Sequence, residues 1–317
     1  RRQAAESSSL AAPDQTQQPP SLLTVAREWG RIGVLGFGGP PAHIAMLREL
    51  VVDRRGWMAA SRFEDAIAAC NLLPGPASTQ LCIFSAWSLR GTAGALVGGL
   101  AFILPGLILI AALAALFLGS PPDWVRGAGG GAGAAVAAVA VHGGWGLVAP
   151  SRERAQSLVR WTFYAALGFV AAATLGAWVV LALLGAGIAE VFVRRAEPSP
   201  GTSGVHAWPL IPLGVAIAAA TGGLGALAWV AFKVGALSYG GGFVIIPLMQ
   251  RDAVETYEWM SGAEFLNAVA LGQVTPGPVT HTVAVVGYAA AGFGGALLAT
   301  AIAFAPSFLF VLGGARH

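Results

Sequence analysis

The chain has 317 residues, of which 56% are apolar and only 10% are charged, and its formal net charge is +3. A soluble domain carries about a quarter charged residues, so this composition excludes an ordinary water-soluble fold. The small charge gives no reason to expect a nucleic-acid partner, and the lipid bilayer is the expected surrounding.

Residues 1–21 are rich in Ser, Gln and Pro, a composition that predicts a disordered N-terminal segment. Long uncharged segments follow, and neither 92–118 nor 127–149 contains an Asp, Glu, Lys or Arg. About 20 apolar residues cross a bilayer as a helix. We therefore expect an all-α, polytopic (multi-pass) membrane protein.

Glycine and proline interrupt two segments of the first half. Gly36-Phe37-Gly38-Gly39-Pro40-Pro41 divides residues 22–51, and Leu73-Pro74-Gly75-Pro76 divides residues 63–89. Because Pro cannot donate to the helical ladder and Gly admits positive φ, we expect broken or re-entrant helices. Non-helical backbone at membrane depth is tolerated where it is buried or lines a cavity, which makes these breaks candidate sites. The alternative is a simple kink or a close packing contact.

An internal repeat follows. Residues 31–76 align without a gap on 233–278 at a constant offset of 202, which pairs Trp57-Met58 with Trp259-Met260 and Pro74-Gly75-Pro76 with Pro276-Gly277-Pro278. Chance similarity between apolar helices does not give such matches, so we predict two copies of one helical unit. The expected boundaries are 22–195 for the first unit, 196–208 for a linker and 209–317 for a second unit that is shortened at its C-terminal end.

The charges predict how the two units are oriented. Arg48, Arg54, Arg55 and Arg62 are among the arginines that flank the early segments, whereas the matching loop of the second unit, 251–264, carries only Arg251 against four acidic residues. Lys and Arg are enriched in cytoplasmic loops, so the two loops are expected on opposite sides, which makes the repeat inverted. Secondary transporters with such repeats bind their substrate where the halves meet.

The breaks favour an anion as the substrate. Each new half-helix presents free N–H groups and about half a positive charge, so four converging ends would match a dianion. Pro41 suits a first helical position, and Ser78 and Thr280 suit capping. We expect Arg31 and Lys233 to attract the anion, with interfacial anchoring as the alternative. The expected substrate-binding residues are Phe37, Gly38, Gly39, Pro40, Asn71, Pro74, Gly75, Pro76, Ser78, Thr79, Gln80, Tyr239, Gly240, Gly241, Gly242, Gln273, Pro276, Gly277, Pro278, Thr280 and His281.

Enzymatic chemistry is not expected. The sequence has no paired catalytic carboxylates, no Cys/His cluster at metal-ligand spacing and no nucleophile motif at membrane depth, so we predict no cofactor and no metal. Cys70 and Cys82 are expected to be small buried hydrophobes. The sequence does not determine the oligomeric state, and a homodimer is one of the arrangements it allows.

The motifs resemble those of the chromate ion transporters of the long-chain, two-domain type. The resemblance rests on Gly36-Phe37-Gly38-Gly39-Pro40, Leu72-Leu73-Pro74-Gly75-Pro76, Tyr239-Gly240-Gly241-Gly242 and Gly272-Gln273-Val274-Thr275-Pro276-Gly277-Pro278. It implies a secondary transporter that exports chromate across the bacterial inner membrane and confers chromate resistance, with sulfate as a close mimic. A carrier or channel for sulfate or another oxyanion is the alternative, and a non-transporting scaffold is a third. Asn71 departs from the family pattern, which usually has Gln there.

Overall fold

The computed structural model describes residues 19–119, scattered positions between 123 and 155, and residues 157–175, 185–187, 189–190, 223–238 and 245–314. Within those residues every regular element is a helix, which confirms the all-α prediction. The predicted residues Tyr239, Gly240, Gly241 and Gly242 lie outside the described part.

The helices of the first half end and begin at the Gly/Pro segments. The first break contains Gly38 and Gly39 at φ of +97° and +71°, and the second contains Gly75 at +113°. Glycine is the residue that adopts these angles without steric cost. The helices are α1 (Leu22–Leu35), α2 (Pro40–Arg48), the π-helix η1 (Glu49–Arg54), α3 (Ala60–Leu72) and α4 (Ala77–Leu118).

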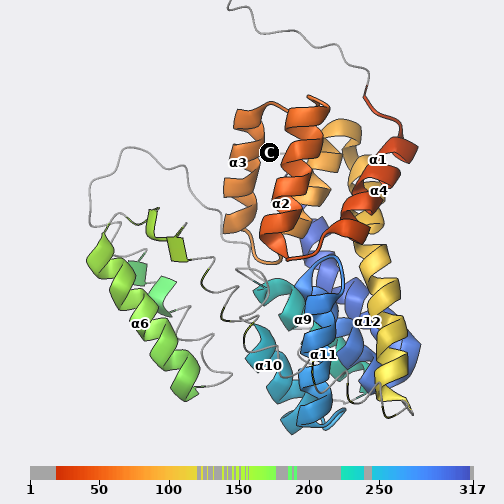
Figure 1. Ribbon diagram of the computed structural model, residues 1–317, viewed down its shortest axis with the longest axis vertical. Coiled ribbons are helices and arrows are strands. Elements are labelled where there is room, and N and C mark those ends of the chain that lie inside the picture. Colours follow the sequence, from red (N-terminus) through yellow and green to blue (C-terminus); the bar gives the residue numbers. More distant parts are fainter. Residues whose placement is uncertain are drawn as a thin grey trace, which may run out of the picture.

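The second half repeats this succession. Its π-helix lies 202 positions after the first one, and α3 and α11 are both 13 residues long. Gly277 has a φ of +97°, close to that of Gly75. The helices are α9 (Gly223–Leu237), α10 (Ile246–Gln250), η4 (Arg251–Thr256), α11 (Gly262–Val274), η5 (Val279–His281) and α12 (Thr282–Gly314), and α6 (Leu158–Leu175) lies to one side (Figure 1).

The helix α4 folds back on itself. Arg90 and Gly91 leave the helical conformation, and Gly91 has a φ of +60°. A Cβ placed on Gly94 would meet the carbonyl oxygen of Ala86, and one on Gly98 would lie 2.5 Å from the Ala86 side chain. Residues eight positions apart in a straight helix are separated by about 12 Å. The element is therefore a short arm, 77–89, packed against a long arm, 92–118, and Gly94 and Gly98 serve close packing.

The helix α12 folds back in the same way at Ala291 and Gly292, whose φ is +61°. Gly287 and Gly295 cross so closely that a Cβ on Gly295 would meet the Gly287 carbonyl oxygen. Its short arm is 282–290 and its long arm is 293–314. In the described part of the chain, two helical stretches are long and apolar enough to cross a membrane. They are α4 and Val279–Gly314.

Helix lengths divide the elements into two kinds. The 14 residues of α1 and the 13 of α3 and α11 span about 20 Å each, less than the hydrocarbon core of about 30 Å. The long arms of α4 and α12 reach about 40 Å and 33 Å, enough to cross it. The fold thus combines short helices with two long arms.

The long arms connect the two halves of the molecule. Figure 1 shows α1, α2 and α3 in one half and α9, α10 and α11 in the other, with α4 and α12 extending along both. Gly98 contacts Trp29 of α1, whereas Ile110, farther along the same arm, joins the core around Leu227 and Phe265 of the second half. In return Val311 of α12 packs on Ile83 of α4.

The outer surface of the long arms is apolar. Ile108 and Leu297 are 68% and 57% exposed, and an apolar groove of about 570 Å³ runs between α4 and α12. Water-soluble proteins rarely present contiguous apolar surface of this kind, whereas a bilayer solvates it.

Candidate functional site

The broken backbone of both halves meets at the centre of the molecule. The N–H of Gly277 donates a 3.0 Å hydrogen bond to the carbonyl oxygen of Gly36. A Cβ on Gly75 would lie 3.2 Å from the carbonyl oxygen of Gly235, and a Cβ on Gly277 would lie 4.0 Å from that of Gly33, the repeat-equivalent of Gly235. The Pro-Gly-Pro turn of each half therefore lies against the end of the first helix of the other half.

Polar side chains also join the two breaks within each half. In the first half, His43 Nε2 lies 2.9 Å from the Gly36 carbonyl oxygen and Nδ1 lies 3.3 Å from Ser78 Oγ. A carbonyl only accepts, so Nε2 carries the proton and, in a neutral ring, Ser78 donates to Nδ1. In the second half, Ser238 Oγ lies 3.2 Å from Thr280 Oγ1. Thr280 thus connects the start of a half-helix to the end of α9, and Ser78 is connected through His43 to the end of α1.

The predicted capping role of Ser78 and Thr280 is wrong. Pro76 occupies the N-cap of α4 and Pro278 that of η5, and neither has a side-chain cap hydrogen bond. The hydroxyls instead form hydrogen bonds with His43 and Ser238. Ser78 and Thr280 lie inside their helices, and a capping side chain must come from the N-cap residue that precedes the helix. The first helical position of α2 is also occupied by proline, but by Pro40 and not by Pro41, which is the second residue of the helix.

Several polar atoms at this centre have no hydrogen-bond partner among the described residues. They belong to Thr79, Gln80, Gln273, His281 and Ser307, and for His281 both ring nitrogens are unpartnered. Leaving a buried polar group unsatisfied costs about 1–3 kcal/mol, so such groups are typical of a place that water or a ligand fills. The amide of Gln80 is oriented by its 2.6 Å donation to the Pro74 carbonyl oxygen, which turns Oε1 away from that contact.

The predicted residues do not all share this buried centre. Thr79, Gln80, Thr280 and His281 are at most 1% exposed, and the residues Gly75, Pro76, Pro276, Gly277 and Pro278 are buried with them. By contrast Phe37 is 54% exposed, and Gly38 and Asn71 are also exposed. The exposure of the remaining described residues is intermediate; they are Gly39, Pro40, Pro74 and Gln273.

Besides Gly36, His43 and Ser238, other residues outside the predicted set belong to the centre. Gly235 approaches Gly75, Gly106 approaches Pro276 and His281, and Ser307 Oγ lies 3.4 Å from the position of a Gly75 Cβ. The signal for Ser307 was its polarity in an otherwise apolar helix, directly after Pro306. Cys70 and Cys82 are buried and free, as expected.

The two predicted anion-attracting cations have different surroundings. Lys233 Nζ lies 2.5 Å from Asp252 Oδ2, and the lysine also lies over the Trp229 ring. Its charge is therefore compensated by a carboxylate that the sequence interpretation left out. Arg31 is exposed and lines a small pocket with Glu28, Glu49 and Arg54.

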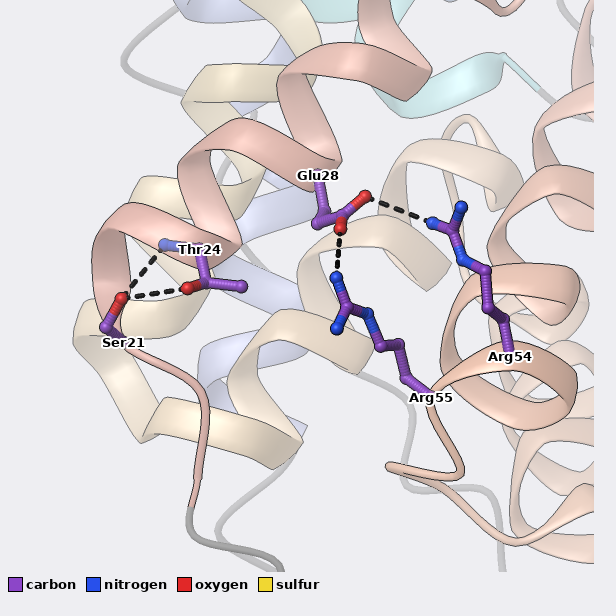
Figure 2. Close-up of polar contacts among 5 residues, drawn as sticks. All are labelled: Ser21, Thr24, Glu28, Arg54 and Arg55. Carbon is purple, nitrogen blue, oxygen red and sulfur yellow. Dashed lines mark hydrogen bonds and ion pairs between the residues drawn. The ribbon is translucent and has the colours of Figure 1, made fainter.

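An arginine cluster marks the outer end of the first half. Figure 2 shows Glu28 accepting hydrogen bonds from Arg54 at 3.1 Å and Arg55 at 2.7 Å, close to the Ser21–Thr24 cap of α1. The Arg55 guanidinium also lies 5.4 Å from the centroid of the Trp57 ring. The positions 202 residues later hold Val230, Thr256 and Tyr257, so the second half has no such cluster there. At these equivalent positions the two halves therefore differ in charge.

Comparison with known proteins agrees with this organisation. Residues 23–191 and 225–317 match the family described as "Chromate transporter". The chain is 33% identical over 303 residues to "Chromate transport protein" of Cupriavidus metallidurans, covering 89% of this chain and 71% of the relative. It is 30% identical over 297 residues to "Chromate transport protein" of Pseudomonas aeruginosa, covering 89% and 70%.

A third relative is "Probable chromate transport protein" of Synechococcus elongatus, which is 29% identical over 298 residues, 92% of this chain and 75% of the relative. No solved structure matches. The names of these relatives describe transport proteins and not enzymes. Two matched regions that together take in both Pro-Gly-Pro turns, and relatives aligned over most of the chain, show that this protein belongs to the chromate transporter family.

Proposed function

We propose that this chain is a secondary transporter that exports chromate across the bacterial inner membrane, and that it binds the oxyanion where the broken helices of its two halves meet. The observation that carries the proposal is the contact of each Pro-Gly-Pro turn with the other half, through Gly277 to Gly36 and through Gly75 to Gly235. Broken helices at an interface between two repeats are the usual place of substrate binding in secondary transporters.

Three helix beginnings support an anion as the ligand. The helices α2, α4 and the η5–α12 stretch begin directly after Gly39, Pro76 and Pro278. The partial positive charge of helix N-termini favours a negatively charged ligand. The first residues of α4 and of the η5–α12 stretch add N–H groups, whereas α2 begins with two prolines, which have none. The unpartnered hydroxyls of Thr79 and Ser307 add donors of the kind that an oxyanion accepts from.

We further propose that the two halves are inverted repeats whose short helices are re-entrant. The long arm of α4 begins beside Trp29 and ends in the core of the second half, whereas α12 ends beside Ile83 of the first half. Two long arms that run in opposite directions between the same two halves are what an inverted pair predicts. The units would comprise residues 22–195 and 209–317, with 1–21 before them and 196–208 between them.

The direction of transport follows from charge and potential. With the arginine cluster of Figure 2 at the cytoplasmic end, the positive-inside tendency is met and a dianion would be attracted from the cytoplasm. A potential of 100 mV, inside negative, is worth about 2.3 kcal/mol per charge, or about 4.6 kcal/mol for a dianion that leaves. Export would therefore run downhill without ATP.

The test is uptake of labelled chromate by liposomes that contain the purified full chain. We expect saturable uptake that excess sulfate reduces, because two tetrahedral dianions would fit similar half-helix ends. Labelled sulfate in the same vesicles distinguishes the alternative, a carrier of sulfate or another oxyanion. A protein that moves neither anion would refute the proposal.

A matched pair of variants separates a carrier from a scaffold. Thr79→Val removes a buried hydroxyl that has no partner, whereas Thr300→Val removes one that donates to the Ala296 carbonyl oxygen, away from the breaks. A carrier should keep its expression in both variants and lose most of its chromate flux only in Thr79→Val. Equal flux in the two variants would argue against a site at Thr79.

A further inference from the structure

Ser307 is an unusual serine. It lies in the long arm of α12, is fully buried, and its Oγ has no hydrogen-bond partner among the described residues. A serine or threonine inside a helix commonly donates to the carbonyl four residues before it. Ser85 does so to Leu81, and Thr300 does so to Ala296, but Ser307 does not. Its hydroxyl is therefore free to bind something else.

The hydroxyl faces a helix N-terminus that belongs to the other half of the molecule. A single point, the position of a Cβ on Gly75, lies 3.4 Å from Ser307 Oγ and 2.9 Å from Gln80 Nε2. Gly75 precedes the first turn of α4, whose short arm begins at Ala77. The first N–H groups of a helix have no partner within the helix and favour anions. Two independent features, an unpaired hydroxyl and a helix N-terminus, thus meet at Gly75.

The other Pro-Gly-Pro turn is built differently. The repeat-equivalent of Ser307 is Gly106, where a Cβ would lie 2.5 Å from the Pro276 carbonyl oxygen and 2.7 Å from Cε1 of His281. The equivalent of His281 in the first half is the smaller Thr79. The imidazole therefore occupies the space beside Gly277 that a side chain at 106 would need, whereas beside Gly75 a small hydroxyl points at the turn.

We propose that Ser307 is a substrate-binding residue and that the oxyanion binds on the Gly75 side, at the N-terminus of α4, and not on the Gly277 side that His281 fills. The Ser307 hydroxyl and the first N–H groups of α4 donate to the anion's oxygens, Thr79 adds a second hydroxyl, and Gln80 holds the turn through Pro74. This inference rests on the proposed function. It assigns the anion to one of the two repeat-related Pro-Gly-Pro turns, the one that contains Gly75.

The experiment compares Ser307→Ala with Ser85→Ala in the full chain, by chromate flux in liposomes and by thermal unfolding in detergent with and without chromate. A hydrogen bond to a charged group is worth a factor of ten or more in affinity, so Ser307→Ala should raise the KM for chromate about tenfold. Its melting temperature without anion should not fall, because the lost hydroxyl had no partner. At a chromate concentration near the wild-type KM, chromate should raise the melting temperature of the wild type and of Ser85→Ala clearly more than that of Ser307→Ala.

The outcomes separate this inference from the function on which it depends. If the wild type moves chromate and Ser307→Ala keeps its KM and its chromate-dependent stabilisation, the assignment of Ser307 is wrong and the proposed transport stands. If Ser307→Ala unfolds at a lower temperature without any anion, the hydroxyl is structural and the assignment is again wrong. A wild type that moves no chromate removes the proposed function itself.

Discussion

At the scale of single residues, position 258 differs from its counterpart in a way that bears on stability. Glu258 has a φ of +51°, whereas the residue 202 positions earlier is Gly56, with a φ of +57°. The left-handed conformation costs an L residue about 1–2 kcal/mol because its Cβ crowds the following carbonyl oxygen. The turn before Trp259 is thus held in a conformation that its own residue disfavours.

We expect Glu258→Gly to raise the free energy of unfolding by up to about 1 kcal/mol, since part of the relieved strain is offset by the larger chain entropy of glycine. Gly56→Ala should lower it by about 1 kcal/mol for the opposite reason. Thermal unfolding of the purified variants in detergent measures both. A lower melting temperature for Glu258→Gly would show that its carboxylate makes a contact worth more than the strain.

Residue identity alone located the breaks but not the partners of the polar residues around them. Gly and Pro restrict the backbone wherever they occur, so the helix ends at Gly36 and Pro74 could be predicted locally. The partner of Ser78 is His43, 35 residues away, and that of Lys233 is Asp252, 19 residues away. Such contacts depend on how the helices pack, which no local pattern contains.

At the scale of one element, α12 carries two adjacent glycines with opposite surroundings. A Cβ on Gly295 would meet the Gly287 carbonyl oxygen, whereas a Cβ on Gly294 would meet nothing within 4 Å. The close crossing of the two arms therefore requires glycine at 295 and not at 294. Both positions are helical, so their helix propensities cancel in the comparison.

We expect Gly294→Ala to stabilise the protein by up to about 1 kcal/mol, the difference in helix propensity between the two residues. Gly295→Ala should destabilise it by about 1–3 kcal/mol, because the arms must separate to admit the methyl group. Melting temperatures of the two variants, measured in parallel, give the result. Equal effects would mean that the arms are not in contact at this position.

The turns in α4 and α12 were not predicted from the sequence. Gly91 follows Arg90, and Gly292 stands shortly before Gly294 and Gly295, but a glycine inside a helical pattern is generally tolerated and does not by itself predict a turn. What reveals the turn is the φ of about +60° at both positions and the crossing of Gly94 and Gly295 with residues on the preceding arm. Likewise, no local pattern predicted the two π-helices.

At the scale of the whole molecule, the proposed inversion places equivalent loops on opposite sides of the membrane. Ser61 and Ala263 are equivalent by the 202-residue offset, and both are exposed near the start of a short helix. They follow the outer turns that connect η1 to α3 and η4 to α11. They therefore form a matched pair for determining topology.

We expect single cysteines at Ser61→Cys and Ala263→Cys to react from opposite sides with a membrane-impermeant thiol reagent, in a chain whose Cys70 and Cys82 are replaced. Ser61→Cys should be labelled only in inverted vesicles, and Ala263→Cys only in intact spheroplasts. The cysteine-free chain is the control. Labelling of both from the same side would exclude the inverted arrangement, while leaving the family assignment unaffected.

The sequence motifs were sufficient to predict the family, because its Gly/Pro segments recur at fixed spacing in both halves. They were not sufficient to distinguish the Gly75 side of the proposed site from the Gly277 side, since Thr79 and His281 occupy equivalent places and the sequence does not show which of them leaves room beside its turn. The distinction required the packing of Gly106 and Ser307 against the two turns.

The fold-back at Gly91 has a consequence for counting membrane crossings. If α1, α2, α3 and the short arm of α4 are re-entrant, as proposed, residues 22–118 would cross the membrane once, along the long arm. Leu118 packs on the outer core of the second half, and α9 runs inward from Gly223 to meet Ala303. In the proposed inverted arrangement, the chain would therefore leave the first unit and enter the second on the same face of the membrane.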